Sequence, residues 1–156
     1  DVYKRQLLDG EEFGGMGSQR VSEQILSGEF GKIDWVLNLE LSGKGGRKFF
    51  MGNYPGPLQE RIKSLLNPPI TSTPFNDSVI FRRNGIDSCV INPLPIMEKI
   101  DEVFIYNDDS NGVMFEGERL DMSLLFNCHS PKDTIHTIDP QDMQEFTEDV
   151  VYKILS

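Results

Sequence analysis

The chain has 156 residues, of which 38% are apolar and 26% charged, and this suffices for one globular domain with a hydrophobic core. A net charge of −10 argues against nucleic acid and anionic membrane surfaces as partners. No run of residues is long and apolar enough to span a membrane.

The N-terminal segment does not fit the sequence that follows it. Asp1 to Gln6 resemble a translated sequencing-adaptor scar, so we expect residues 7–156 to be the native part and to belong to a single domain. Leu7-Leu8 predicts the end of a buried strand. Helical spacing of apolar residues then predicts a short helix from Gly15 to Leu26.

A strong strand signal lies between Ile33 and Leu41, where every second residue is apolar. Val36 on the opposite face predicts burial on both sides of this strand. After a glycine-rich turn, Lys48 to Met51 predicts a second short strand. Pro57 to Asn67 predicts a helix that starts at its proline.

The C-terminal half continues the alternation of strands and helices. Ser88 to Asn92 predicts a short core strand, and residues 103–106 and 113–118 predict a hairpin. Asp139 is the expected N-cap of a last helix, whose apolar face comprises Met143, Phe146, Val150 and Ile154. The whole pattern predicts an α/β layered domain, and the hairpin favours a mixed sheet over a purely parallel one.

The adjacent glutamates Glu11 and Glu12 are the most informative local feature. They lie between the apolar pair Leu7-Leu8 and a glycine-rich turn, and adjacent like charges at the edge of a core are unfavourable unless a cation offsets them. A divalent metal can bind one carboxylate while the other acts as a base. Taken alone, such a pair more often belongs to a solvated turn, but the nearby glycines permit close backbone approach and weaken that interpretation.

Glu40 and His129 are further candidate ligands, because each lies where a predicted strand gives way to a loop. A carboxylate and a histidine with an open position for water suit zinc. In isolation, Glu40 is more simply a charge at the end of a strand, and His129 a loop histidine. Asp133 either starts a turn or orients His129.

The remaining polar and sulfur-containing candidates have simpler interpretations. His136 is predicted to be a surface residue, and Asp108 and Asp109 to form an exposed hairpin tip, with a calcium-like oxygen cluster left open. Cys89 and Cys128 are too few for a disulfide framework. We interpret both as small buried hydrophobes, and a bridge between them is not favoured.

Four motifs resemble those of the M28 family of zinc aminopeptidases and follow the family's order. Asp9 to Ser18 resembles the family's Asp-x-Glu-Glu-x-Gly-x-x-Gly-Ser motif, and Asn38 to Gly43 its Asn-Leu-Asp-x-x-Gly strand. Phe81 to Ile86 resembles the Phe-x-x-x-Gly-Ile segment that precedes a core strand. His129 to Thr134 resembles the His-Thr-x-x-Asp-Thr motif before the final helix. The resemblance covers nearly the whole chain from Leu7.

The resemblance implies a three-layer α/β/α fold with a mixed twisted sheet of the zinc-exopeptidase type, truncated at its N-terminus. It implies that Glu11 is the general base, that Glu12 binds one zinc and Glu40 the other, and that His129 completes a zinc shell. The implied activity is that of a zinc-dependent aminopeptidase acting on peptides or small aminoacyl substrates. It also favours an extracytoplasmic or secreted location.

The sequence departs from the family pattern at three points. The family's upstream His-x-Asp motif, which supplies a histidine and a zinc-bridging aspartate, does not occur here. We expect that motif in a missing N-terminal part, so the fragment as given should neither hold two zincs nor catalyse well. Glu40 stands where the aminopeptidases carry Asp, and Asn127-Cys128 stands where an aromatic residue is common. Two alternatives therefore stay open: a one-zinc acyltransferase similar to glutaminyl cyclase, and a catalytically silent homologue that serves as a binding domain.

Overall fold

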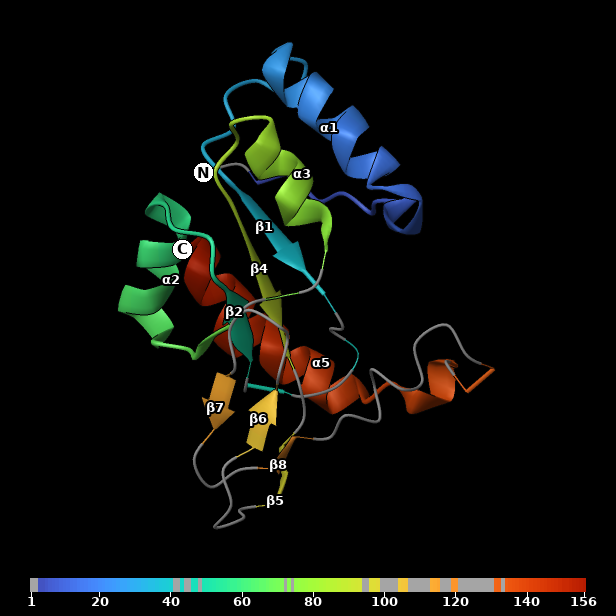
Figure 1. Ribbon diagram of the computed structural model, residues 1–156, viewed down its shortest axis with the longest axis vertical. Coiled ribbons are helices and arrows are strands. Elements are labelled where there is room, and N and C mark those ends of the chain that lie inside the picture. Colours follow the sequence, from blue (N-terminus) through green and yellow to red (C-terminus); the bar gives the residue numbers. More distant parts are fainter. Residues whose placement is uncertain are drawn as a thin grey trace.

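The computed structural model describes residues 3–40, 43, 46–47, 49–71, 73, 75–93, 96–98, 104–106, 113–115, 119–120, 131–132 and 134–156. In chain order the elements are η1 (Glu11–Phe13), α1 (Met16–Leu26), β1 (Val36–Leu39), β2 (Phe50–Gly52), α2 (Pro57–Leu66), β3 (Ile70–Thr71), α3 (Asp77–Arg83), β4 (Ser88–Asn92), β5 (Ile96–Glu98), β6 (Phe104–Tyr106), β7 (Val113–Phe115), β8 (Arg119–Leu120), η2 (Ile135–Thr137), α5 (Pro140–Phe146), η3 (Thr147–Val151) and α6 (Tyr152–Leu155). Figure 1 shows the helices arranged around a central sheet.

The central sheet has four strands in the order β1-β4-β2-β3, and it is mixed as predicted. β1 runs parallel to β4, with Val36 opposite Ser88. β2 runs antiparallel to β4 and parallel to β3. Two further two-stranded sheets pair β5 with β8 and β6 with β7, and the second pair is the predicted hairpin.

The sheet separates two helical layers because the side chains of its central strand β4 alternate between the two faces. Cys89 and Ile91 face α2 and the C-terminal helix, and they belong to a core cluster that also contains Phe49, Met51, Leu58, Ile62, Phe146, Val150 and Ile154. On the other face, the Ser88 hydroxyl donates to the Ser78 hydroxyl of α3 at 3.0 Å. The predicted three-layer α/β/α architecture is thus confirmed.

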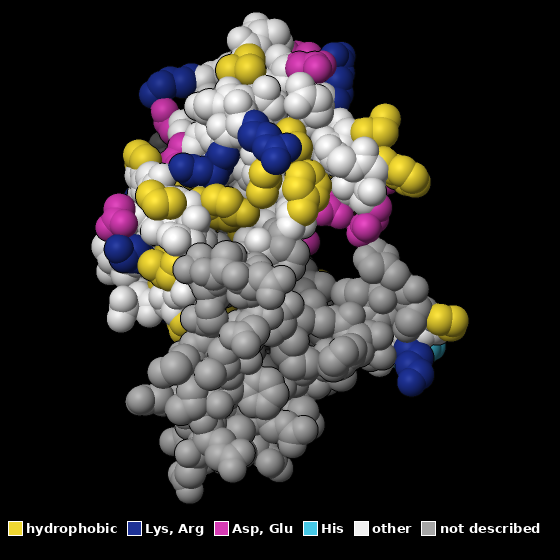
Figure 2. Space-filling model, viewed as in Figure 1, with side chains coloured by type: hydrophobic (Ala, Val, Ile, Leu, Met, Phe, Trp, Pro, Cys, Tyr) yellow, Lys and Arg dark blue, Asp and Glu magenta, His cyan; other side chains and the backbone are white. Residues whose placement is uncertain are grey.

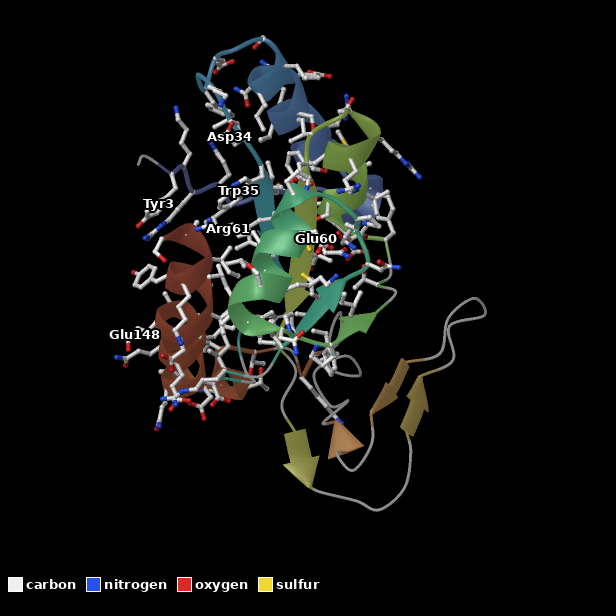
Figure 3. All side chains as sticks on the ribbon, turned by 90° about the vertical axis from the view of Figure 1, so that its left-hand side faces the viewer. Tyr3, Asp34, Trp35, Glu60, Arg61 and Glu148 are labelled. Carbon is white, nitrogen blue, oxygen red and sulfur yellow. The ribbon has the colours of Figure 1, made fainter. Side chains whose placement is uncertain are left out.

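The C-terminal helix consists of α5, the π-helical turn η3 and α6. Its buried residues Phe146, Val150 and Ile154 recur at every fourth position, and in a regular α-helix such positions drift around the axis by about 40° per step. The wider π-helical turn reduces this drift and keeps all three side chains on the core. Figure 3 shows Arg61 of α2 beside this helix, where its Nε donates to the carbonyl oxygen of Ile154 at 2.9 Å.

Met143 does not share the buried face predicted for it, because 40% of its surface is exposed. It lies in the first turn of α5, at the end of the C-terminal helix away from α2 (Figure 1). The core that the helix shares with α2 begins only at Phe146. The predicted N-cap is confirmed, since the Asp139 carboxylate accepts hydrogen bonds from two backbone N–H groups of the first turn.

The structure corrects the predictions about the N-terminal strands at three points. Leu7 is fully exposed, and residues 3–8 pair with no described strand. β1 covers Val36–Leu39 and is shorter than the predicted strand, because the pairing with β4 joins these four residues to Ser88–Ile91. Its expected burial on both sides is not found either: Leu39 is 42% exposed, since β1 lies at an edge of the described sheet and has β4 as its one neighbour there.

Several elements have no counterpart among the predictions, namely the seven-residue helix α3, the strands β3, β5 and β8, and the short helices η1 and η2. In the part of the chain that the structure describes, no helix combines the length and the apolar character that crossing a bilayer requires.

Candidate functional site

Glu11 and Glu12 lie in the short helix η1, which glycines hold against the rest of the fold. Gly10 and Gly14 flank η1 in left-handed conformations, with φ of 73° and 86°. Gly15 follows with φ of 75°, and a Cβ at this position would lie 2.6 Å from Cγ1 of Ile80 in α3. Only glycine fits such a contact, so the turn that carries the glutamates packs directly on α3.

Glu40 lies directly after β1, where the strand ladder fixes its backbone. Its N–H donates to the carbonyl oxygen of Ile91 at 3.1 Å, which extends the pairing with β4 by one residue. Its side chain is half-buried, and its Oε1 accepts a hydrogen bond from Asn38 Nδ2 at 2.8 Å. Glu40 is therefore held at the carboxyl end of a strand, as the sequence predicted.

Asp77, the first residue of α3, is a fourth carboxylate that the sequence interpretation missed. It is only 6% exposed, and its Oδ1 has no hydrogen-bond partner. The preceding Asn76 is the N-cap, with its side chain accepting from Ser78 N at 3.0 Å. An Asn-Asp-Ser run before an apolar segment is a helix-start signal, and this signal could have located Asp77.

The carboxylates of these three segments act on one another electrostatically. Burial raises the pKa of Glu11, and the nearby charges of Glu12, Glu40 and Asp77 raise it further. Burial also raises the pKa of Glu40, with added contributions from Asp77 and Glu12 that its hydrogen bond from Asn38 opposes. These four carboxylates are therefore near enough to influence one another's pKa, and we call the part of the surface that they occupy the acidic region.

Figure 1 shows why these segments meet: the first turns of α1 and α3 and the carboxyl end of β1 lie at the same level of the molecule. In the same region, Figure 2 shows acidic side chains next to exposed hydrophobic ones. Phe13 and Met16, which follow the glutamates in sequence, are 81% and 65% exposed. The acidic region thus has apolar surface at its border.

Carboxylate oxygens are ligands for divalent cations such as zinc, and Asp77 Oδ1 is a buried oxygen without a hydrogen-bond partner. Within the described ranges, no three side chains of the metal-ligating types surround one point. His129, the predicted nitrogen ligand, lies outside the described residues, as do Asp133, Asp108, Asp109 and Cys128.

The other candidates agree with their simpler interpretations. His136 is exposed. Cys89 is a free, fully buried thiol, and burial raises its pKa to about 12. Neither residue belongs to the acidic region.

Comparison with known proteins identifies the family. The profile of Peptidase family M28 matches residues 6–154. Among solved structures, a zinc aminopeptidase from Bacillus subtilis aligns with a TM-score of 0.58 at 18% identity, over 93% of this chain and 33% of that protein. An aminopeptidase from Aneurinibacillus sp. strain AM-1 aligns with a TM-score of 0.58 at 15% identity, over 95% of this chain and 31% of that protein.

These structural likenesses show a shared fold, and the chain spans about a third of the length of the two proteins. No curated protein matches the sequence at a significant level. The family profile covers almost the entire chain and includes the segments that carry Glu11, Glu12 and Glu40. The chain therefore belongs to peptidase family M28.

Proposed function

We propose that this chain is part of a zinc-dependent aminopeptidase, which hydrolyses the peptide bond next to a free N-terminus. The observation that carries the proposal is the meeting of Glu11, Glu12 and Glu40 in one acidic region of a chain that matches family M28. The solved neighbours support it, since both are named aminopeptidases and one is named a zinc enzyme.

In this proposal Glu12, Glu40 and His129 hold zinc. When bound, zinc polarises the scissile carbonyl and makes water more acidic. Glu11 accepts a proton from the attacking water at a carboxylate oxygen while the water oxygen bonds to the carbonyl carbon. The C–N bond then breaks, and Glu11 returns the proton to the leaving nitrogen.

The same proposal includes a low activity for this chain alone. The family resemblance assigns part of a two-zinc site to a His-x-Asp motif, and no His-x-Asp sequence occurs in the 156 residues. We expect the chain to bind zinc weakly and to hydrolyse peptides slowly, whereas a full-length protein with that motif would hold two zincs.

Zinc titration by calorimetry, together with hydrolysis of an aminoacyl anilide, tests these roles. Glu12→Gln should weaken zinc binding, whereas Glu11→Gln should retain zinc and lower hydrolysis by about 10²-fold or more. Glu23→Gln, an exposed change in α1, is the charge-matched control and should alter neither property.

The outcomes also separate the alternative activities. Unchanged hydrolysis in Glu11→Gln would remove its role as base. Conversion of an N-terminal glutaminyl peptide to a cyclic product with release of ammonia, without anilide hydrolysis, would indicate a cyclase instead. Zinc binding with neither reaction, in a full-length protein that carries the His-x-Asp motif, would indicate a binding domain.

A further inference from the structure

The connection from β1 to β2 lies against the first turns of the C-terminal helix. The carbonyl oxygen of Gly43 accepts a hydrogen bond at 2.9 Å from the N–H of Asp139, the N-cap of α5. A Cβ on Gly43 would lie 3.2 Å from Cγ1 of Ile138. Gly46 is buried, and a Cβ there would lie 3.3 Å from Oδ1 of Asp142. The backbone of this connection therefore approaches the helix closely at two separate positions.

The side chain of Arg47 adds a third attachment, one turn further along the same helix. Its Nε forms an ion pair with Oδ2 of Asp149 and lies 3.5 Å from Oε2 of Glu145. Asp149 also pairs with Lys153 at 3.8 Å, so it keeps a cationic partner when Arg47 is removed. Loss of Arg47 would therefore release the connection from the helix without leaving Asp149 unpaired.

These attachments begin very close to Glu40, which follows β1. The N–H of Glu40 donates to the carbonyl oxygen of Ile91 at 3.1 Å, and two residues separate Glu40 from Gly43. β1 lies at an edge of the described sheet, and the end of an edge strand opens more easily than a central strand because it is paired on one side. A second fixed point directly after Glu40 opposes that opening.

We propose that Gly43, Gly46 and Arg47 form a clamp that holds the carboxyl end of β1 on the C-terminal helix, and that Arg47 is a positioning residue for Glu40. The inference rests on the proposed function for the use that is made of Glu40. It extends that function, since the motifs that pointed to zinc assign no role to Arg47. The side chain of Arg47 is 66% exposed, so the effect of its ion pairs should be modest.

Hydrogen exchange of the native, metal-free chain, measured by NMR at the Glu40 N–H, tests the clamp. Arg47→Met removes the ion pairs and should lower the protection of this N–H by about twofold to fivefold, the range expected for an exposed pair. The buried amides of β4 should change less, because they report the stability of the whole fold. Arg47→Lys keeps the charge and should recover part of the protection.

Two further variants make the test specific. Arg20→Met removes an equally exposed ion pair from α1 and should leave the protection at Glu40 unchanged. Asp149→Asn should cause a loss similar to that of Arg47→Met, and the double variant should lose little more, because both changes break the same pair.

Unchanged protection at Glu40 in Arg47→Met would overturn the inference and leave the proposed function standing. So would an equal loss of protection in β4, which would show that Arg47 stabilises the fold as a whole, or losses that simply add in the double variant. Absence of saturable zinc binding by a full-length protein that carries the His-x-Asp motif would overturn the proposed function and leave the clamp standing.

Discussion

The neighbouring glycines Gly14 and Gly15 provide a matched test of how closely the glutamate turn packs on α3. Both have left-handed backbones, but a Cβ on Gly14 would meet nothing within 4 Å. A Cβ on Gly15 would lie 2.6 Å from Ile80 Cγ1 and 2.9 Å from the Ser18 hydroxyl. We expect Gly14→Ala to lower the free energy of unfolding by about 1–2 kcal/mol, the cost of left-handed strain alone. Gly15→Ala should add an overpacking cost of about 1–3 kcal/mol, for a total of roughly 2–5 kcal/mol.

Urea unfolding followed by circular dichroism measures both changes on the metal-free chain. Combining Gly15→Ala with Ile80→Ala should recover part of the overpacking cost, because the second change removes the obstructing side-chain atoms. Equal losses for Gly14→Ala and Gly15→Ala would refute the reasoning. So would a double variant in which the two losses simply add.

Three other predictions concern a helix cap, a buried thiol and the acidic region. Asp139→Ala should lower the free energy of unfolding by about 1 kcal/mol, because it removes the N-cap of α5, and an unchanged urea midpoint would contradict this. Since Cys89 is fully buried and its pKa is raised to about 12, a thiol reagent at pH 8 should label it only as fast as the chain opens, whereas rapid labelling of Cys89 in a native Cys128→Ser variant would exclude the buried position. The raised pKa values of Glu11 and Glu40 mean that the folded state holds more protons than the unfolded state just above the ordinary carboxyl pKa, so metal-free stability should fall as the pH rises through that window. The Glu40→Gln variant should flatten this part of the stability profile, and an unchanged slope would show that Glu40 does not contribute to it.

Local signals in the sequence were enough to predict the positions of the longer helices and strands. Helical spacing located α1 and α2, and a short apolar run located β4, because these signals depend on residues close together in the chain. The short helix α3 was missed, since seven residues with a polar first turn carry little periodicity. The burial of β1 was misjudged because it depends on how many strands lie beside it, and alternation in one segment does not report its neighbours.

The candidate site was only partly predictable for a related reason. Glu11, Glu12 and Glu40 were identified from motifs, but their proximity depends on how η1 and β1 are placed by α3 and β4. Asp77 is counted in the region because its charge acts on Glu11 and Glu40. Its burial and its oxygen without a hydrogen-bond partner are properties of the folded chain. A sequence motif can therefore suggest ligands, while the charges that surround them require the structure.

The parallel pairing of β1 with β4 has a consequence for the order of folding. The two strands are separated in sequence by β2, α2, β3 and α3, so their pairing closes a long loop and brings a large entropic cost. Contacts between α3 and β4, such as Ser78 with Ser88, span only a short stretch of chain and should form earlier. Glu40 would then reach Asp77 only when β1 joins the sheet. The acidic region would therefore form late in folding. By then most of the hydrophobic core has formed, and its stability offsets the repulsion between the carboxylates of the acidic region.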